Sequence, residues 1–132
     1  MNNKNKNSKI YANHSDCRRL LELISVELQE RRGLTALFLR TLQDELRQAR
    51  VLSEKKLPLD VVALGKRVQI EDLDVGRTME VIPVMPIEAD RGKNLSVLSP
   101  LGMAIFGYRA GDRVDWGPIE HLIRFRIEHV TA

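Results

Sequence analysis

The sequence predicts an α+β fold in which a short N-terminal antiparallel helical hairpin precedes an antiparallel β domain with one short helix. Three observations point to this order. Apolar residues recur at steps of three and four between residues 17 and 49, alternating β-branched segments follow residue 60, and "SPLGMAIFG" (99–107) carries the start and stop signals of a single short helix. We therefore divide the chain into a disordered tail (1–14), a helical hairpin (15–52), a linker (53–60) and a β domain (61–132).

The first half of the chain has the apolar period of two helices packed side by side. The seam residues are Cys17, Leu21, Ile24 and Leu28 in the first helix and Leu39, Leu42, Leu46 and Ala49 in the second. Ser15 is expected as the N-cap of a helix from about Asp16 to Arg32, and Gly33 as its left-handed C-cap. Such a helix is about 25 Å long at 1.5 Å per residue, so the hairpin is short. The apolar stripe is widened by Leu20, Leu23, Leu37 and Phe38, which are expected to cover the β domain or, alternatively, a partner chain.

Composition indicates the tail and the linker. The opening "MNNKNKNSK" is rich in Asn and Lys and contains no acid, so it has nothing to bury. "SEKKLPLD" (53–60) interrupts the helical period, and Pro58 disfavours a helix around it.

Beyond the linker the pattern is typical of strands. The segments are "VVAL" (61–64), "RVQIED" (67–72), "TMEVIPV" (78–84), "LSVLS" (95–99), "RVDW" (113–116) and "LIRFRIEHV" (122–130). In the last of these, Ile123, Phe125, Ile127 and His129 are expected on one face of an antiparallel strand.

The short helix has clear end signals. Ser99 stands where an N-cap belongs, and Pro100 takes the first helical position, where its missing N–H costs nothing. Gly107 is expected to close the helix.

Charge and cysteine content argue against several classes of function. The net charge of +3 comes from Lys4, Lys6 and Lys9, so the rest of the chain is neutral and lacks the concentrated basic charge of a direct nucleic-acid binder. The single cysteine, Cys17, forms no internal disulfide, and no segment has the apolar run of a signal peptide or a membrane span. The histidines lack metal-ligand spacing. We expect a cytoplasmic protein without a metal, a cofactor or a membrane association.

The run "EADRGKNLSVLSPLGMAIFGYRAGDRV" (88–114), with "VVALGKRV" (61–68), resembles the C-terminal domain of the bacterial Gre transcript-cleavage factors and of the related Rnk-type regulators of nucleoside diphosphate kinase. The resemblance implies an FKBP-like β domain that docks on RNA polymerase at the rim of its secondary channel. It also implies a coiled coil that points into that channel.

The same resemblance assigns a docking role to the loop before the short helix. Ser99 and Pro100 match the family motif, whereas Leu98 replaces a residue that is commonly acidic or an amide. This departure leaves the affinity and the orientation of docking open. Helix capping alone is the alternative role of Ser99 and Pro100, and the two roles are compatible.

The hairpin tip departs from the cleavage factors, which carry two acidic residues that help to hold a catalytic Mg²⁺ ion. A hard cation needs oxygen ligands. Here "ERRGLTALF" (30–38) places Gly33 and Ala36 about where that pair falls, which leaves Glu30 as the lone carboxylate beside Arg31 and Arg32. Glu30 is expected in a surface ion pair. The arginines either contact an acidic polymerase surface or lie in a solvated turn.

We therefore predict a noncatalytic RNA polymerase-binding regulator of the Rnk branch that competes with Gre factors near the secondary channel. Two alternatives stay open: a regulator of another enzyme, such as nucleoside diphosphate kinase, and a prolyl isomerase. An isomerase needs an apolar pocket lined by aromatics, for which the chain offers Phe106, Tyr108, Trp116 and Phe125. The sequence leaves the oligomeric state and the direction of regulation open.

Overall fold

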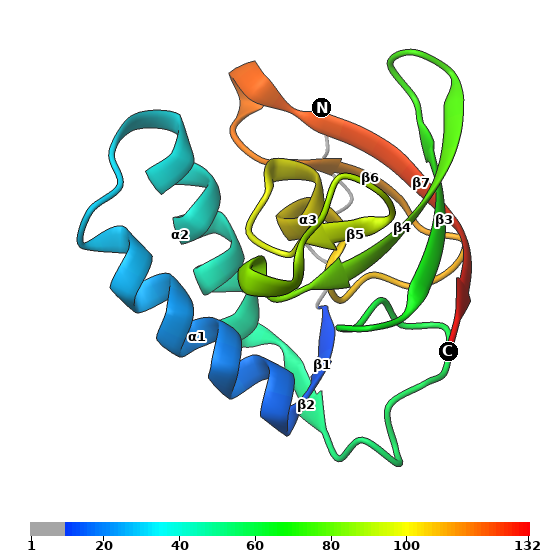
Figure 1. The fold of residues 1–132 in the computed structure, drawn as a ribbon, viewed down its shortest axis with the longest axis horizontal. Coiled ribbons are helices and arrows are strands. Elements are labelled where there is room, and N and C mark those ends of the chain that lie inside the picture. Colours follow the sequence, from blue (N-terminus) through cyan, green and yellow to red (C-terminus); the bar gives the residue numbers. More distant parts are fainter. Residues whose placement is uncertain (1–9) are drawn as a thin grey trace.

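The structure, a computed structural model, describes residues 10–132 and confirms the α+β class (Figure 1). Its elements are β1 (Tyr11–Asn13), α1 (His14–Leu28), α2 (Gly33–Gln48), β2 (Arg50–Leu52), β3 (Arg67–Asp72), β4 (Arg77–Val84), the 3₁₀ turn η2 (Pro86–Glu88), β5 (Asn94–Ser96), α3 (Pro100–Ile105), β6 (Arg113–Trp116), the 3₁₀ turn η3 (Ile119–His121) and β7 (Ile123–Thr131). The hairpin of α1 and α2 lies along one side of the β domain, and α3 lies between α2 and the sheet (Figure 1).

The main sheet has the strand order β5-β4-β3-β7-β6. The pairs β3–β4, β3–β7 and β6–β7 are antiparallel, as the alternating pattern predicts. β5 is the exception and pairs with β4 in parallel, because the segment 85–93 carries the chain back until Asn94 lies opposite Ile82. This return brings the loop that precedes α3 to the edge of the sheet.

The face assignment of β7 is correct up to Ile127 and wrong at His129. Phe125 and Ile127 are buried, but His129 is exposed. In the register with β3, Gln69 lies opposite His129 and Ile70 lies opposite Ile127, so Glu128 is an extra residue. Such a β-bulge inverts the alternation beyond it.

The N-terminal boundary of the fold lies earlier than predicted. Residues 1–9 of the expected tail (1–14) lie outside the described residues, but residues 10–14 belong to the fold. Ile10 is buried, and β1 pairs in parallel with β2, which replaces the expected end of the second helix. The N-cap of α1 is Asn13 rather than Ser15, because the Asn13 Oδ1 accepts a hydrogen bond from the Asp16 N–H at 2.7 Å.

The hairpin is shorter than the sequence indicates. α1 ends at Leu28 instead of Arg32, and its 15 residues give a length of about 22 Å. Gly33 is left-handed as predicted, with φ of 65°, but it opens α2 rather than closing α1. The segment 53–60 contains no helix or strand, and its Leu57 is buried against Val61 and Ala63.

The hairpin and the β domain share one apolar core. Leu20, Ile24 and Leu42 are fully buried in the same cluster as Trp116 and Phe125 of the sheet. The ring of Phe38 packs on that of Trp116 with centroids 5.7 Å apart. The expectation that extra apolar residues of the helices cover the β domain is therefore correct for Leu20 and Phe38. It is wrong for Leu37, which is 47% exposed, and Leu23 is only half-buried.

A half-buried carboxylate on α2 joins the two parts. Glu45 accepts hydrogen bonds from the Trp116 indole N–H at 2.8 Å and from the Tyr108 hydroxyl. Burial raises the pKa of Glu45 to about 7, and the two hydrogen bonds offset only part of this rise. The same surroundings raise the pKa of the Tyr108 hydroxyl, chiefly through burial and then through the charge of Glu45.

This carboxylate makes the stability depend on pH. A group whose pKa is higher in the folded than in the unfolded chain stabilises the fold at low pH and loses that contribution as pH rises through the folded value. We expect the stabilising contribution of protonated Glu45 to be lost between pH 4.5 and about 7. At about 1.4 kcal/mol per pKa unit, the free energy of unfolding then falls by at most roughly 3 kcal/mol. The Glu45→Gln variant keeps an acceptor for Trp116 and is expected to lose this slope. Urea unfolding of both proteins across the range measures it, and parallel stability curves would contradict the assignment.

Candidate functional site

The loop that enters α3 is fixed by its own hydrogen bonds. The Ser99 hydroxyl accepts a hydrogen bond from the Gly102 N–H at 3.1 Å and donates one to the Ser96 carbonyl at 2.7 Å. The Leu98 N–H donates to the Ser96 hydroxyl at 3.1 Å, and Pro100 occupies the first turn of the helix. The predicted cap is confirmed, and the hydrogen bonds connect Leu98 and Ser99 to Ser96 at the end of β5.

Gly102 brings α3 into direct contact with the preceding strand. A Cβ atom added at Gly102 would lie 2.1 Å from the Ser96 carbonyl oxygen and 2.9 Å from the Val97 Cα. No larger residue fits without moving this backbone. Sequence reasoning did not single out Gly102, although it follows the Ser99-Pro100 pair in the family motif.

The structure brings three predicted site residues together in one groove. Arg31 comes from the hairpin turn, and Leu98 and Ser99 come from the loop before α3. The groove has a volume of about 290 Å³, and its other walls are Glu27, Thr35, Leu39, Pro86 and Ser96. We call it the hairpin–loop groove. Glu30, Arg32 and Pro100 are exposed and do not line it.

The charges at the hairpin turn differ from the expected pairing. The Arg31 guanidinium pairs with the Glu27 carboxylate at 2.9 Å, one helical turn earlier, rather than with Glu30. The Arg32 guanidinium donates to the Arg31 carbonyl at 3.1 Å. The Arg31 side chain stays 55% exposed, so this surface pair contributes little to stability and leaves the guanidinium accessible.

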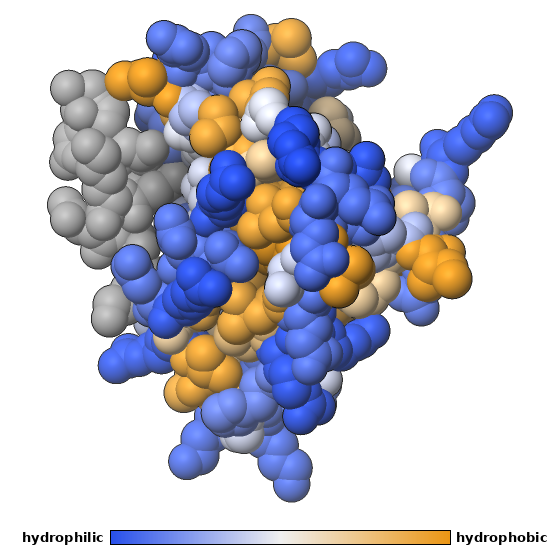
Figure 2. All heavy atoms as spheres, turned by 90° about the vertical axis from the view of Figure 1, so that its left-hand side faces the viewer, coloured by the Kyte–Doolittle hydropathy of each residue, from blue (hydrophilic) through white to orange (hydrophobic). Residues whose placement is uncertain are grey.

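Exposed apolar side chains adjoin the groove. Ile87 is 95% exposed and follows Pro86 of the groove wall, and Leu34 is partly exposed beside Thr35. Figure 2 shows the face formed by the hairpin, where apolar surface is open between rows of polar side chains. Ile87 gave no functional signal in the sequence, since an apolar residue between Pro86 and Glu88 is also compatible with a core position.

We also searched residues 10–132 for a metal site, a membrane-spanning helix and a reactive cysteine. Among residues 10–132, no group of three or more His, Cys, Asp or Glu side chains is placed to hold a metal ion. Within the same residues, no helix is long and apolar enough to cross a membrane. Cys17 is buried in the helix seam, where burial raises the pKa of its thiol.

A helical hairpin that precedes a β domain with a capped short helix is the arrangement that the resemblance to the Gre factors implies. The family model described as "Transcription elongation factor, GreA/GreB, C-term" matches residues 57–132, which is more than half of the chain. The protein therefore belongs to the GreA/GreB family through its C-terminal domain.

Named relatives and one solved structure agree with this assignment. The chain is 33% identical over 93 residues to the Regulator of nucleoside diphosphate kinase of Escherichia coli, covering 67% of this chain and 68% of that protein. It is 32% identical over 87 residues to Transcription elongation factor GreA of Acetivibrio thermocellus, covering 65% of this chain and 55% of that factor. A solved GreA/GreB elongation factor from Nitrosomonas europaea matches with a TM-score of 0.70 at 26% identity, over 95% of this chain and 99% of that one.

The cap of α3 gives a stability prediction. The Ser99→Ala variant loses both hydroxyl hydrogen bonds, so we expect the free energy of unfolding to fall by about 1 kcal/mol. The Ser99→Thr variant keeps the hydroxyl and is expected to lose less. Denaturant unfolding of the three proteins measures the difference, and an equal loss in both variants would rule out the cap as the cause.

Proposed function

We propose that this protein is a noncatalytic regulator that binds bacterial RNA polymerase through the hairpin–loop groove, near the secondary channel, and competes there with Gre factors. One observation carries the proposal: Arg31 of the hairpin and Leu98 and Ser99 of the loop line the same groove. A partner seated on the loop therefore also meets the hairpin.

The chemistry of the tip supports a noncatalytic role. Ala36 is buried, and Gly33 carries no side-chain oxygen. The turn offers one carboxylate, Glu30, next to the positive charges of Arg31 and Arg32. A site that holds Mg²⁺ relies on several oxygen ligands, commonly including carboxylates, and this turn presents too few.

The length of the hairpin supports the same conclusion. Each helix spans about 22–24 Å, with 15 residues in α1 and 16 in α2. The resemblance implies much longer coiled coils in the cleavage factors, which reach from the channel rim to the active centre. With a hairpin this short, Arg31 and Arg32 would lie at the mouth of the polymerase secondary channel and contact acidic surface of the polymerase there.

Transcription is the process indicated by the family. The matched family model and the A. thermocellus and N. europaea relatives are all described as transcription elongation factors, which supports RNA polymerase as the partner.

A second candidate function rests on the E. coli relative, whose name describes a regulator of nucleoside diphosphate kinase. On that basis the same groove would bind another enzyme. A prolyl isomerase is not favoured by the structure, because Phe106, Tyr108, Trp116 and Phe125 are all at most 3% exposed and serve the core.

A competition experiment tests the proposed function. Labelled Gre factor is bound to RNA polymerase core, this protein is titrated in, and transcript cleavage is followed in the same samples. We expect the label to be released and cleavage to fall together. Failure to bind or compete would refute the proposal. Recovery of the kinase without polymerase subunits, in a pull-down with the tagged protein, would favour the second function.

The exposed isoleucine beside the groove gives a sharper prediction. We expect Ile87→Ser to weaken polymerase binding by a factor of roughly 10 to 100, because burying one isoleucine at an interface contributes about 1.5–3 kcal/mol. Leu59→Ser is the matched control, since Leu59 is 83% exposed in the segment between β2 and β3 and away from the groove. Both changes are expected to leave the urea midpoint unchanged. Equal affinities of the two variants would remove Ile87 from the interface.

A further inference from the structure

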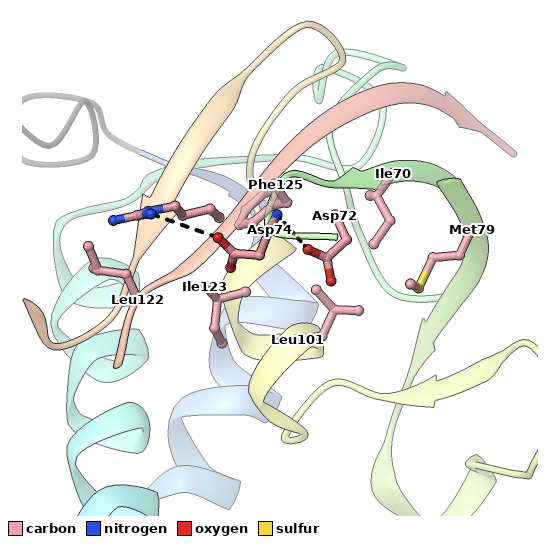
Figure 3. Close-up of a pocket in the computed structure, with 9 residues that line it drawn as sticks. Ile70, Asp72, Asp74, Met79, Leu101, Leu122, Ile123 and Phe125 are labelled. Carbon is pink, nitrogen blue, oxygen red and sulfur yellow. Dashed lines mark hydrogen bonds and ion pairs between the residues drawn. The ribbon is translucent and has the colours of Figure 1, made fainter. Parts of the chain in front are cut away.

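A second hollow lies beside the first turn of α3, at the start of β7 and the end of β3 (Figure 3). Its apolar walls are Ile70, Met79, Leu101, Leu122, Ile123 and Phe125. Asp72, Asp74 and Arg124 provide its charged groups. We call it the Leu101 hollow. Leu101 follows Pro100 directly, so the hollow adjoins the proposed docking loop.

The size of the hollow limits what it accepts. Its volume is about 190 Å³, below the roughly 300–1,000 Å³ that is usual for pockets that hold cofactors and other small molecules. A single long side chain is therefore a better match than a nucleotide or a cofactor.

One oxygen of the Asp72 carboxylate accepts hydrogen bonds within the β3–β4 turn, and the other lies in the hollow. The Asp72 Oδ1 accepts hydrogen bonds from the N–H groups of Asp74 at 2.9 Å and Val75 at 3.3 Å, which fixes the β3–β4 turn. In Figure 3 the other oxygen is directed toward Leu101. A carboxylate oxygen in this position accepts hydrogen bonds only, so it selects a donor.

Among residues 10–132, the neighbouring cations form no ion pair with Asp72. Arg124 pairs with Asp74 at 3.8 Å, and both side chains are about half exposed. Arg77 lies opposite Asp72 in the strand register, but it does not line the hollow.

We propose that the Leu101 hollow binds a lysine side chain of the docked partner, with the aliphatic stem on Leu101 and Ile123 and the ammonium group on Asp72. This inference rests on the proposed function, because the partner is the one that docks on residues 98–100. Lysine matches both surfaces, since its stem packs on apolar groups while its head keeps polar partners. A purely apolar side chain would cover the Asp72 oxygen without supplying a donor, which is unfavourable.

The first test uses the isolated protein and n-butylammonium chloride as the probe for the lysine side chain. In ¹⁵N-labelled protein we expect saturable shifts of the Asp74, Leu101 and Ile123 amides. Two control probes are expected to give smaller shifts: sodium chloride supplies a cation without the alkyl stem, and n-butanol supplies the stem without the charge. Asp72→Asn keeps the acceptor for the turn but removes the charge, so the shifts are expected to disappear. Equal shifts with sodium chloride, or in the Asn variant, would overturn the proposal.

The second test measures binding to RNA polymerase core. We expect Asp72→Asn to weaken binding about tenfold, the factor for the loss of one hydrogen bond to a charged group. Asp44→Asn, at an exposed position of α2, is the control and is expected to bind like the wild type. Unchanged binding of Asp72→Asn would overturn the assignment to a partner lysine. If the wild-type protein does not bind polymerase, the proposed function fails, and the butylammonium titration still decides whether the hollow takes an alkylammonium group.

Discussion

Glu45 fixes how the helical hairpin sits on the β domain. Its carboxylate accepts hydrogen bonds from Trp116 in β6 and from Tyr108 after α3, so two separate segments of the β domain converge on one side chain of α2. Apolar contacts such as Phe38 on Trp116 supply much of the attraction, but they tolerate small displacements. The half-buried, hydrogen-bonded carboxylate of Glu45 tolerates displacement less well, because a shift leaves its donors without an acceptor.

The position of α2 in turn sets the geometry of the hairpin–loop groove. Arg31 lines the same groove as Leu98 and Ser99 because the hairpin packs against the domain that carries the loop. A second polar contact supports the base of the hairpin, where the Asp16 carboxylate accepts a hydrogen bond from the Leu64 N–H at 3.2 Å. Burial raises the pKa of Asp16, and this backbone contact partly offsets the rise. The groove is therefore a composite of both halves of the chain, and neither half forms it alone.

Sequence reasoning succeeded where structure depends on neighbouring residues. The Ser99 cap, the seam residues Ile24 and Leu42, and the main strands β3, β4, β6 and β7 follow from local signals. Leu21 and Leu28 of the expected seam are only partly buried, and Ala49 lies just beyond the end of α2. It failed where distant segments decide: β1 is three residues long and is stabilised by pairing with β2. Glu45 stands between Asp44 and Leu46 in a pattern that equally suits a solvent-facing residue. The bulge at Glu128 and the exposure of Ile87 likewise depend on tertiary contacts that no short window contains.

The pairing of β1 with β2 closes the hairpin at its base. The Arg50 N–H donates to the Ile10 carbonyl at 2.9 Å, and the Tyr11 N–H donates to the Gly107 carbonyl at 3.1 Å. Both ends of the hairpin are thus attached to the body of the protein, so it has no single hinge about which to swing. Tilting of its tip requires elastic bending of the helices. Through the Tyr11 hydrogen bond, β1 connects the base of the hairpin directly to Gly107, which follows α3 at the end opposite Ser99.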